Sequence, residues 1–432
     1  MGRWLSPVGV VLQWLAIAGA LAYALALYLA NLLAWPTNVS VRGWWGSELA
    51  IRYCEGFVRR GVLGQLAWLL SGWLGRQSTY TLTLSCVTAV AALVVGLWLG
   101  GQLVRRCGWS LGLLILAAPA GWPVLMVHAG SLFRKDPLQI LLGLLLLWLW
   151  RFGVNGRSPL AAPAPWIALA SLEVVAVLNH EPFALLVLPT LAVAVLWERR
   201  DWRRALLAIS PGLLAFLLAI WQKGNASQVA CLREDLQRLG LLGAGETPGS
   251  SITELALSRP SFFTWDLSPV QMGWSVFHAM AMSLLAVLAY SVLFNRARPS
   301  QPRSAALSDA CRLWGLQLCV AAPLFLATVD YGRWIAMMFC GGLGLLVTQG
   351  PSLVNPPLTA HPAATTPFLT PPKGREPSLQ RGGLAALELV LLPSHCCTYE
   401  PGQILAFVPY AAASQWKALV LHGLALMSSS LS

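Results

Sequence analysis

Long apolar runs recur along almost the whole chain, and only short polar segments separate them. Over 432 residues the sequence is 57% hydrophobic and 11% charged, whereas a soluble protein carries about a quarter charged residues. Unbroken runs of this kind predict membrane-spanning helices, because transmembrane β-strands show short alternating segments instead. The sequence therefore predicts an all-α fold, a polytopic transmembrane helical bundle.

The runs divide into about ten predicted spans by their apolar length. The first run is too long for the apolar core of a signal peptide, so we interpret it as a retained membrane helix. The predicted spans are Val8–Leu33, Tyr80–Val104, Ser110–Val127, Leu138–Trp150, Trp166–Leu178, Phe183–Trp197, Ala205–Trp221, Trp274–Phe294, Leu313–Thr328 and Trp334–Thr348.

The net charge of +12 is explained by membrane topology. If the N-terminus is cytoplasmic, four short basic connections fall on the cytoplasmic side, where Lys and Arg near span ends set the orientation. These connections are Arg105–Arg106, Arg151 with Arg157, Glu198–Arg204 and Asn295–Arg303. We therefore expect no nucleic-acid partner. We expect the inner (plasma) membrane, with the N-terminus and the C-terminal tail in the cytoplasm.

The connections on the opposite face mix acids, bases and histidines. Charges of both signs do nothing for membrane insertion, so they indicate a function on the non-cytoplasmic side. The connections are Glu48–Gly61, His128–Pro137, Asn179–Pro182, Lys223–Gly273 and Asp330–Trp334.

The spans that flank His128–Pro137 and Asn179–Pro182 are short. A span of about 14 residues reaches roughly 21 Å, while the hydrocarbon core is ~30 Å thick. We therefore expect His180 and Glu181 to line a recessed pocket that opens to the non-cytoplasmic side, since charges at that depth need protein or water around them. The alternative is a locally thinned bilayer, in which the turn meets water directly.

Single candidates also have ordinary structural explanations. Glu55 and Arg59 are four residues apart, so a helix that began near Tyr53 would make them a surface ion pair. Asp330 and Arg333, three residues apart, could pair in the same way.

Two further explanations are local. Asp136 precedes Pro137 and could cap the following helix. His128 and His180 lie at outer span ends, where either could be a hydrogen-bonded structural residue.

Together, these groups indicate an anionic lipid-linked substrate. Arginine forks match phosphate oxygens, and a carboxylate or an imidazole can accept a proton from a sugar hydroxyl. The candidate catalytic residues are Glu55, Glu181, His180 and Asp136. The candidate substrate-binding residues are Arg59, Arg60, His128, Arg134, Lys135, Asp330 and Arg333.

The layout resembles bacterial cell-envelope glycosyltransferases of the GT-C superclass, and O-antigen polymerases and ligases. The resemblance lies in the span pattern and in the placement of "EGFVRRG", "FRKDP", "NHEP" and "DYGRW". It implies a membrane glycosyltransferase or polysaccharide polymerase that uses a polyprenyl-linked sugar donor and a glycan or lipid acceptor. It also implies Glu55 or Glu181 as the base. The residues implied to hold the pyrophosphate are Arg59, Arg60, Arg134 and Arg333.

The first outer loop lacks the paired acids of many metal-using GT-C enzymes, so no metal or other cofactor is indicated. A transporter or flippase for a lipid-linked saccharide or another amphiphilic anion is the competing hypothesis. It would require ionisable residues near the bilayer midplane, where the sequence places only Glu173. A non-catalytic scaffold of an envelope-synthesis complex is the third.

The first 349 residues form the predicted transmembrane domain, with outer loops at 34–79 and 223–273. In the second loop Val229, Leu232 and Leu236 repeat at helical spacing and predict an amphipathic helix, either a lid over the site or a passive surface helix. Cys54 and Cys231 both fall on the outer side, and the sequence leaves open whether they form a disulfide. Residues 350–383 are rich in Pro and Thr and predict a disordered linker. Residues 384–432 predict a weakly structured, membrane-interfacial tail.

Overall fold

The computed structural model describes residues 44–74, 77–118, 134–155, 162–222, 224–253, 269–298, 302–327 and 331–349, with a few single positions outside these ranges. All regular structure in these ranges is helical, which confirms the predicted all-α class. Other predictions lie outside the described residues. They concern most of the span at 8–33, the linker at 350–383, the tail at 384–432, and His128 and Asp330.

The helices follow one another with short connections. Their bounds are α3 (Trp44–Ala50), α4 (Val62–Leu74), α5 (Gln77–Cys107), α6 (Trp109–Ala117), α8 (Asp136–Leu149), the π-helical turn η2 (Trp150–Val154), α9 (Pro163–Asn179), α10 (Phe183–Leu186), α11 (Leu188–Arg199), α12 (Trp202–Trp221), α13 (Ala226–Arg238), α14 (Ser250–Thr253), α15 (Pro269–Ala297), α16 (Arg303–Ala327) and α17 (Tyr331–Gln349).

Five helical segments in the described part of the chain are long and apolar enough to cross a membrane. They are Cys86–Cys107, Asp136–Val154, Trp202–Trp221, Ala279–Ala297 and Arg303–Leu326. Helix α9 is apolar but shorter. The predicted span Phe183–Trp197 is not one helix, because the chain breaks at Val187 between α10 and α11, where Pro189 has no backbone N–H to continue the helical bonding. The chain is thus a multi-pass helical protein, while the count of ten spans stays a prediction.

The candidate spans are apolar on their outer faces as well as inside the bundle. Helix α12 exposes Leu206, Leu214 and Leu217 and buries small residues such as Ala208 and Ala215. A soluble helix would place polar residues on its exposed side. Lipid tails are the solvent that suits such a surface.

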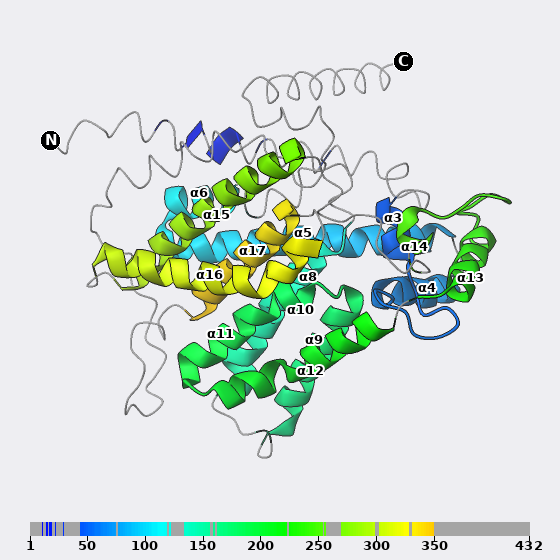
Figure 1. The fold of residues 1–432 in the computed structure, drawn as a ribbon, viewed down its shortest axis with the longest axis horizontal. Coiled ribbons are helices and arrows are strands. Elements are labelled where there is room, and N and C mark those ends of the chain that lie inside the picture. Colours follow the sequence, from blue (N-terminus) through cyan, green and yellow to red (C-terminus); the bar gives the residue numbers. More distant parts are fainter. Residues whose placement is uncertain are drawn as a thin grey trace.

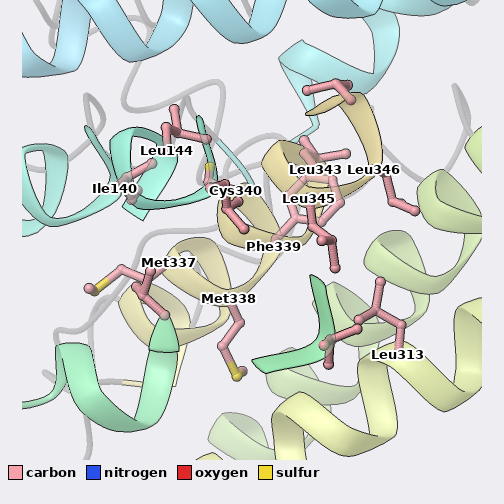
Figure 2. Close-up of a cluster of buried hydrophobic side chains, with 14 of the residues drawn as sticks. Ile140, Leu144, Leu313, Met337, Met338, Phe339, Cys340, Leu343, Leu345 and Leu346 are labelled. Atoms are coloured by element: carbon pink, nitrogen blue, oxygen red, sulfur yellow. The ribbon is translucent and has the colours of Figure 1, made fainter. Parts of the chain in front are cut away.

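Helices α8 and α17 pack against each other in the middle of the molecule (Figure 1). In Figure 2, Phe339 and Leu343 of α17 lie in one apolar cluster with Leu144 of α8 and Leu313 of α16. Tyr290 of α15 places its hydroxyl 3.1 Å from the carbonyl oxygen of Phe339. These contacts make α17 the helix that joins α8, α15 and α16 around the main core.

The charged connections gather at two ends of this bundle. Arg333 at the start of α17 bonds Asp136 at the start of α8. Arg106 at the end of α5 donates to the carbonyl of Val347 near the end of α17. Because Arg333 and Val347 are 14 positions apart in α17, these contacts are separated by about 21 Å at 1.5 Å per residue.

The end of α8 lies beside the end of α11. Trp150 and Arg151 donate to the carboxylate of Glu198 at 2.8 and 2.7 Å. The basic connections near 105–106, 151 and 198–200 therefore share the end away from Asp136 and Arg333. Their assignment to the cytoplasm is a prediction.

A smaller apolar cluster lies where α3, α4, α13 and α14 come together (Figure 1). It contains Leu49 and Leu63 from the first outer loop and Leu232 and Leu236 from the second. Helix α13 confirms the predicted amphipathic helix, and it begins with a capping box formed by Asn225 and Gln228.

Candidate functional site

Charged side chains from five separate segments meet at the end of the bundle where α8 and α17 begin. Helix α3 contributes one residue, the loop before α4 two, the segment leading into α8 two, the turn between α9 and α10 two, and the first turn of α17 one. We call this group the ionic site. Its members are Glu48, Arg59, Arg60, Lys135, Asp136, His180, Glu181 and Arg333.

Arg60 binds Glu181 through a two-nitrogen fork. Its Nε lies 2.8 and 3.0 Å from the two carboxylate oxygens, and a terminal nitrogen lies 2.7 Å from one of them. The other terminal nitrogen lies 3.4 Å from Glu48. Arg59 approaches Glu181 to 3.7 Å. Arg60 therefore joins the first outer loop to the turn between α9 and α10.

Arg333 forms a second fork, with Asp136. Its Nε and a terminal nitrogen donate to the two oxygens of the carboxylate at 2.6 and 2.7 Å. Both side chains are almost completely buried. This pair holds the starts of α8 and α17 together.

His180 lies among three carboxylates. Its Nδ1 is 3.7 Å from Glu181 and 3.9 Å from Glu48, and its Nε2 is 3.9 Å from Asp136. The residue follows α9 directly, in an extended conformation that ends the helix. In this position the imidazole links the two arginine forks.

Lys135 supports the loop that carries the arginines. Its Nζ donates to the backbone carbonyl of Arg60 at 2.6 Å, and its side chain is fully buried. Arg60 has a left-handed backbone, with φ of 66°. This uncommon conformation for a non-glycine residue is thus stabilised by a buried cation. Arg134, the preceding residue, is also buried.

The attraction between opposite charges keeps the carboxylates of the site ionised in spite of their burial. Burial opposes ionisation of Glu181, but Arg60 and His180 outweigh it and lower the pKa of Glu181 well below its usual range. Burial also opposes ionisation of Glu48, and its neighbours, first His180 and then Arg60, lower its pKa. Burial lowers the pKa of Lys135 to about 8, although Glu48 acts to raise it.

Basic groups outnumber acidic groups here among the described residues. The acids are Glu48, Asp136 and Glu181. The bases are Arg59, Arg60, Lys135 and Arg333. An anion that entered beside them would be attracted by charge that the carboxylates do not balance.

The site is partly exposed at one edge. Arg59 and Arg60 retain 29% and 22% of their side-chain exposure, while Glu48 and Asp136 retain 4% and 3%. Arg59 and Arg60 therefore form the outer edge, and Asp136 with Arg333 forms the deep end.

A clamp on helix α13 holds the loop with Arg59 and Arg60. A disulfide joins Cys54 to Cys231, with their Cα atoms 6.0 Å apart. Arg52 pairs with Asp235, and the side chain of Gln228 donates to the carbonyl of Phe57 at 2.9 Å.

This clamp settles one alternative, because the disulfide that the sequence left open is formed. Helix α13 is packed against the loop that carries Arg59 and Arg60. Whether it also acts as a lid or is a passive surface helix stays a prediction.

The thiols and carboxylate of Cys54, Cys231 and Asp235 lie within 4.8 Å of one another, a spacing that could suit a metal ion. In this structure the two sulfurs are bonded to each other and the carboxylate is paired with Arg52. The group is therefore part of the clamp.

The structure joins seven of the predicted site residues through ion pairs and hydrogen bonds, buries Arg134 directly before Lys135, and leaves Glu55 outside these contacts. The residues that meet are Arg59, Arg60, Lys135, Asp136, His180, Glu181 and Arg333. Glu55 is exposed, in a left-handed turn with φ of 53°, and it makes none of the ion pairs of this site.

Two local predictions are wrong. The helix expected from Tyr53 begins only at Val62. The residues before Val62 form a loop that lies against α13. Glu55 and Arg59 therefore do not share a helix face. Asp136 does not cap α8, since no side-chain cap bond forms there and its carboxylate binds Arg333.

Sequence reasoning did not select Glu48. It lies in α3, in the stretch Trp44–Ala50, and it is almost completely buried. The sequence did contain a signal for a buried charge. Glu48 is the one charged residue in the stretch Trp44–Ile51, where two tryptophans precede it and apolar residues follow it.

Comparison of the chain with models of protein families, with curated proteins and with solved structures found no match. The function is therefore argued from the ionic site.

Proposed function

We propose that the protein is a membrane glycosyltransferase or polysaccharide polymerase that takes a sugar from a polyprenyl-phosphate-linked donor at the non-cytoplasmic face. The observation that carries the proposal is the buried ionic site, in which basic groups outnumber acids and two arginines are already held in fork geometry. Arginine binds phosphate oxygens through the same fork. The apolar outer faces of the neighbouring helices suit the long lipid tail of such a donor.

His180 is the proposed proton acceptor. Arg60 and Arg333 hold Glu181 and Asp136 as ionised partners, and the pKa of Glu181 lies well below its usual range. Such a carboxylate is a weak base near neutral pH. Glu181 and Asp136 lie 3.7 and 3.9 Å from the imidazole of His180, so they would stabilise the positive charge that it gains when it accepts the proton. Glu55 is exposed and makes none of the ion pairs of the site, so it is not proposed as the base.

The proposed reaction uses one proton transfer. The acceptor hydroxyl oxygen bonds to the anomeric carbon of the sugar while the bond from that carbon to the phosphate oxygen breaks. The hydroxyl proton passes to His180, and polyprenyl phosphate leaves with both electrons of the broken bond. Arg59 and Arg60, at the outer edge, stabilise the charge on the leaving phosphate.

The test replaces His180 by Ala in cells whose chromosomal copy is deleted. We expect loss of the envelope glycan made with this protein and accumulation of the lipid-linked donor, at an unchanged level of protein in the membrane. Arg238→Ala is the control, because its ion pair with Glu234 is largely exposed and such pairs contribute little. Full glycan in the His180→Ala strain would contradict the enzymatic proposal. Full glycan after loss of every charge of the site would favour a scaffold.

Transport of a lipid-linked saccharide or another amphiphilic anion is the second candidate, and Glu173 is the observation that favours it. This fully buried residue of α9 accepts a hydrogen bond of 3.0 Å from the backbone N–H of Gly212. Gly212 follows Pro211, which lies inside the continuous helix α12 and has no backbone N–H for the helical bonding. An ionisable group within a membrane-spanning helix is a feature of substrate and ion pathways. If the protein is a carrier, Glu173→Gln should stop movement of the donor across the membrane, whereas an enzyme would keep its activity.

A further inference from the structure

Two buried amide side chains lie next to the ionic site and have no hydrogen-bond partner. Asn179 is 1% exposed and Gln139 is 0% exposed. Both the oxygen and the nitrogen of each amide are buried without a partner. Native proteins leave few buried polar atoms unsatisfied, so four such atoms in two neighbouring segments need an explanation.

The position of the two amides connects them with the site. Asn179 is the last residue of α9 and directly precedes His180. Gln139 lies three residues after Asp136 in α8, which places both side chains on one face of the helix. Since the Nε2 atom of His180 is 3.9 Å from Asp136, the end of α9 and the first turn of α8 are adjacent. Each amide therefore belongs to a residue that adjoins the deep end of the ionic site, Asn179 beside His180 and Gln139 one turn after Asp136.

The chemistry of an amide limits what could bind there. An amide nitrogen donates hydrogen bonds and an amide oxygen accepts them. A phosphate diester has only acceptor oxygens, so it cannot satisfy the amide oxygens, and an isoprenoid chain satisfies neither atom. A sugar hydroxyl both donates and accepts, and several hydroxyls on one ring could serve both amides.

We propose that Gln139 and Asn179 form a hydroxyl-binding subsite that holds the sugar ring of the lipid-linked donor, while Arg59 and Arg60 hold its phosphate. This inference rests on the proposed function and specifies which part of the donor binds at which depth. The two amides would select the donor by its hydroxyl pattern, because a ligand without the matching hydroxyls leaves buried polar atoms unsatisfied.

The experiment measures binding of lipids to the purified full-length protein in detergent. The probes are polyprenyl phosphate itself and polyprenyl-phosphate-linked glucose, galactose, mannose and N-acetylglucosamine. We expect at least one sugar-bearing lipid to bind about tenfold more tightly than polyprenyl phosphate, which corresponds to one or two hydrogen bonds. This comparison needs no variant, so it does not depend on the folding of a mutant.

The variants Asn179→Leu and Gln139→Met remove each amide with little change of volume. Each should abolish most of the preference for the sugar-bearing lipid and leave the affinity for polyprenyl phosphate unchanged. The melting temperature of the ligand-free protein should not fall, because replacing an unsatisfied buried amide by an apolar group removes no bond.

Gln317→Met is the matched control. Gln317 is equally buried, but its amide is satisfied, since its nitrogen donates to the carbonyl of Met338 at 3.0 Å and its oxygen lies 3.4 Å from the hydroxyl of Tyr290. This variant should lower the melting temperature and leave the sugar preference unchanged.

Two results would overturn the inference in different ways. The first result is that polyprenyl phosphate binds but no sugar-bearing lipid binds more tightly. Asn179 and Gln139 variants that also melt at lower temperature would show that buried water bonds the amides. The hydroxyl subsite is then wrong, while the phosphate-binding part of the proposed function survives. If no polyprenyl lipid binds at all, the proposed function fails, and the subsite fails with it.

Discussion

At the scale of single residues, the ionic site depends on pairs in which each charge is stabilised by a specific partner. Asp136 and Arg333 are buried to a degree that charged residues tolerate only when paired. Removing one partner should therefore cost more than removing both.

We predict that Arg333→Met destabilises the protein by about 3–5 kcal/mol, because it leaves the carboxylate of Asp136 buried without its partner. The double variant Arg333→Met with Asp136→Leu should recover part of this loss. Thermal unfolding of the two single variants and the double variant in detergent measures the coupling. A double variant whose loss equals the sum of the single losses would show that the pair is not coupled.

Lys135 leads to a prediction about pH, because its pKa is lowered to about 8. Below this pH the side chain is cationic and attracts a phosphate, and above it the charge is lost. The affinity for polyprenyl phosphate should therefore fall as the pH rises through about 8, in a titration of binding between pH 6 and 10.

The variant Lys135→Arg should remove this fall, since arginine keeps its charge over the whole range. Stability should change in the opposite direction. The unfolded chain binds the proton of Lys135 up to its ordinary pKa of 10.5, so the free energy of unfolding of the ligand-free protein rises with pH between about 8 and 10.5. An identical decline of affinity in both proteins would assign the pH dependence to another group.

At the scale of elements, the conformation of the loop before α4 is held by contacts with α13 and not by the loop's own sequence. A disulfide, an ion pair and a side-chain-to-carbonyl hydrogen bond connect the two segments. Arg60 at the end of this loop is left-handed, a conformation that the surroundings must maintain.

We predict that Cys54→Ser weakens binding of polyprenyl phosphate, because the loop that carries Arg59 and Arg60 loses its covalent link to α13. The free energy of unfolding should fall by about 2–4 kcal/mol, as for other disulfides. Cys311→Ser is the control, since Cys311 is a free, exposed cysteine.

Mass spectrometry after alkylation checks the bond itself. In the unreduced wild-type protein, Cys54 and Cys231 should resist the reagent, and both should react after the protein has been reduced and denatured. Affinity that is unaffected by loss of the bond would mean that Arg52, Asp235 and Gln228 suffice to hold the loop.

At the scale of the whole molecule, the ionic site and the basic connections lie at opposite ends of the bundle. The pair of Asp136 with Arg333 marks one end, and the contact of Arg106 with Val347 marks the other. If the helices between them cross the membrane, the two ends face different compartments.

We predict that a membrane-impermeant thiol reagent labels Glu234→Cys in intact cells and labels Arg203→Cys only after the membrane is opened. Both positions are exposed, the first on α13 near the site and the second at the start of α12. The orientation follows from the arginines at the end of α11 and the start of α12, which should stay in the cytoplasm. The reverse labelling pattern would place the site in the cytoplasm and exclude a donor on the non-cytoplasmic face.

Sequence alone determined the helical class, the apolar character of the long helices and the segments that carry charge of both signs. These are properties of composition and local spacing. Arg134–Asp136, Asn179–Glu181 and Arg333 were found in this way, because charged residues between apolar runs are costly and therefore conspicuous.

The tertiary structure alone decided which of these charges are partners. Asp136 meets Arg333 across 197 positions and Glu181 meets Arg60 across 121, and no local pattern encodes such distances. Glu48 belongs to the ionic site and Glu55 does not, although both lie in the same outer loop. The reason is the non-helical path of the chain between α3 and α4. That path is determined by burial of Leu49 and by the contacts with α13, and these exist only once distant helices have packed.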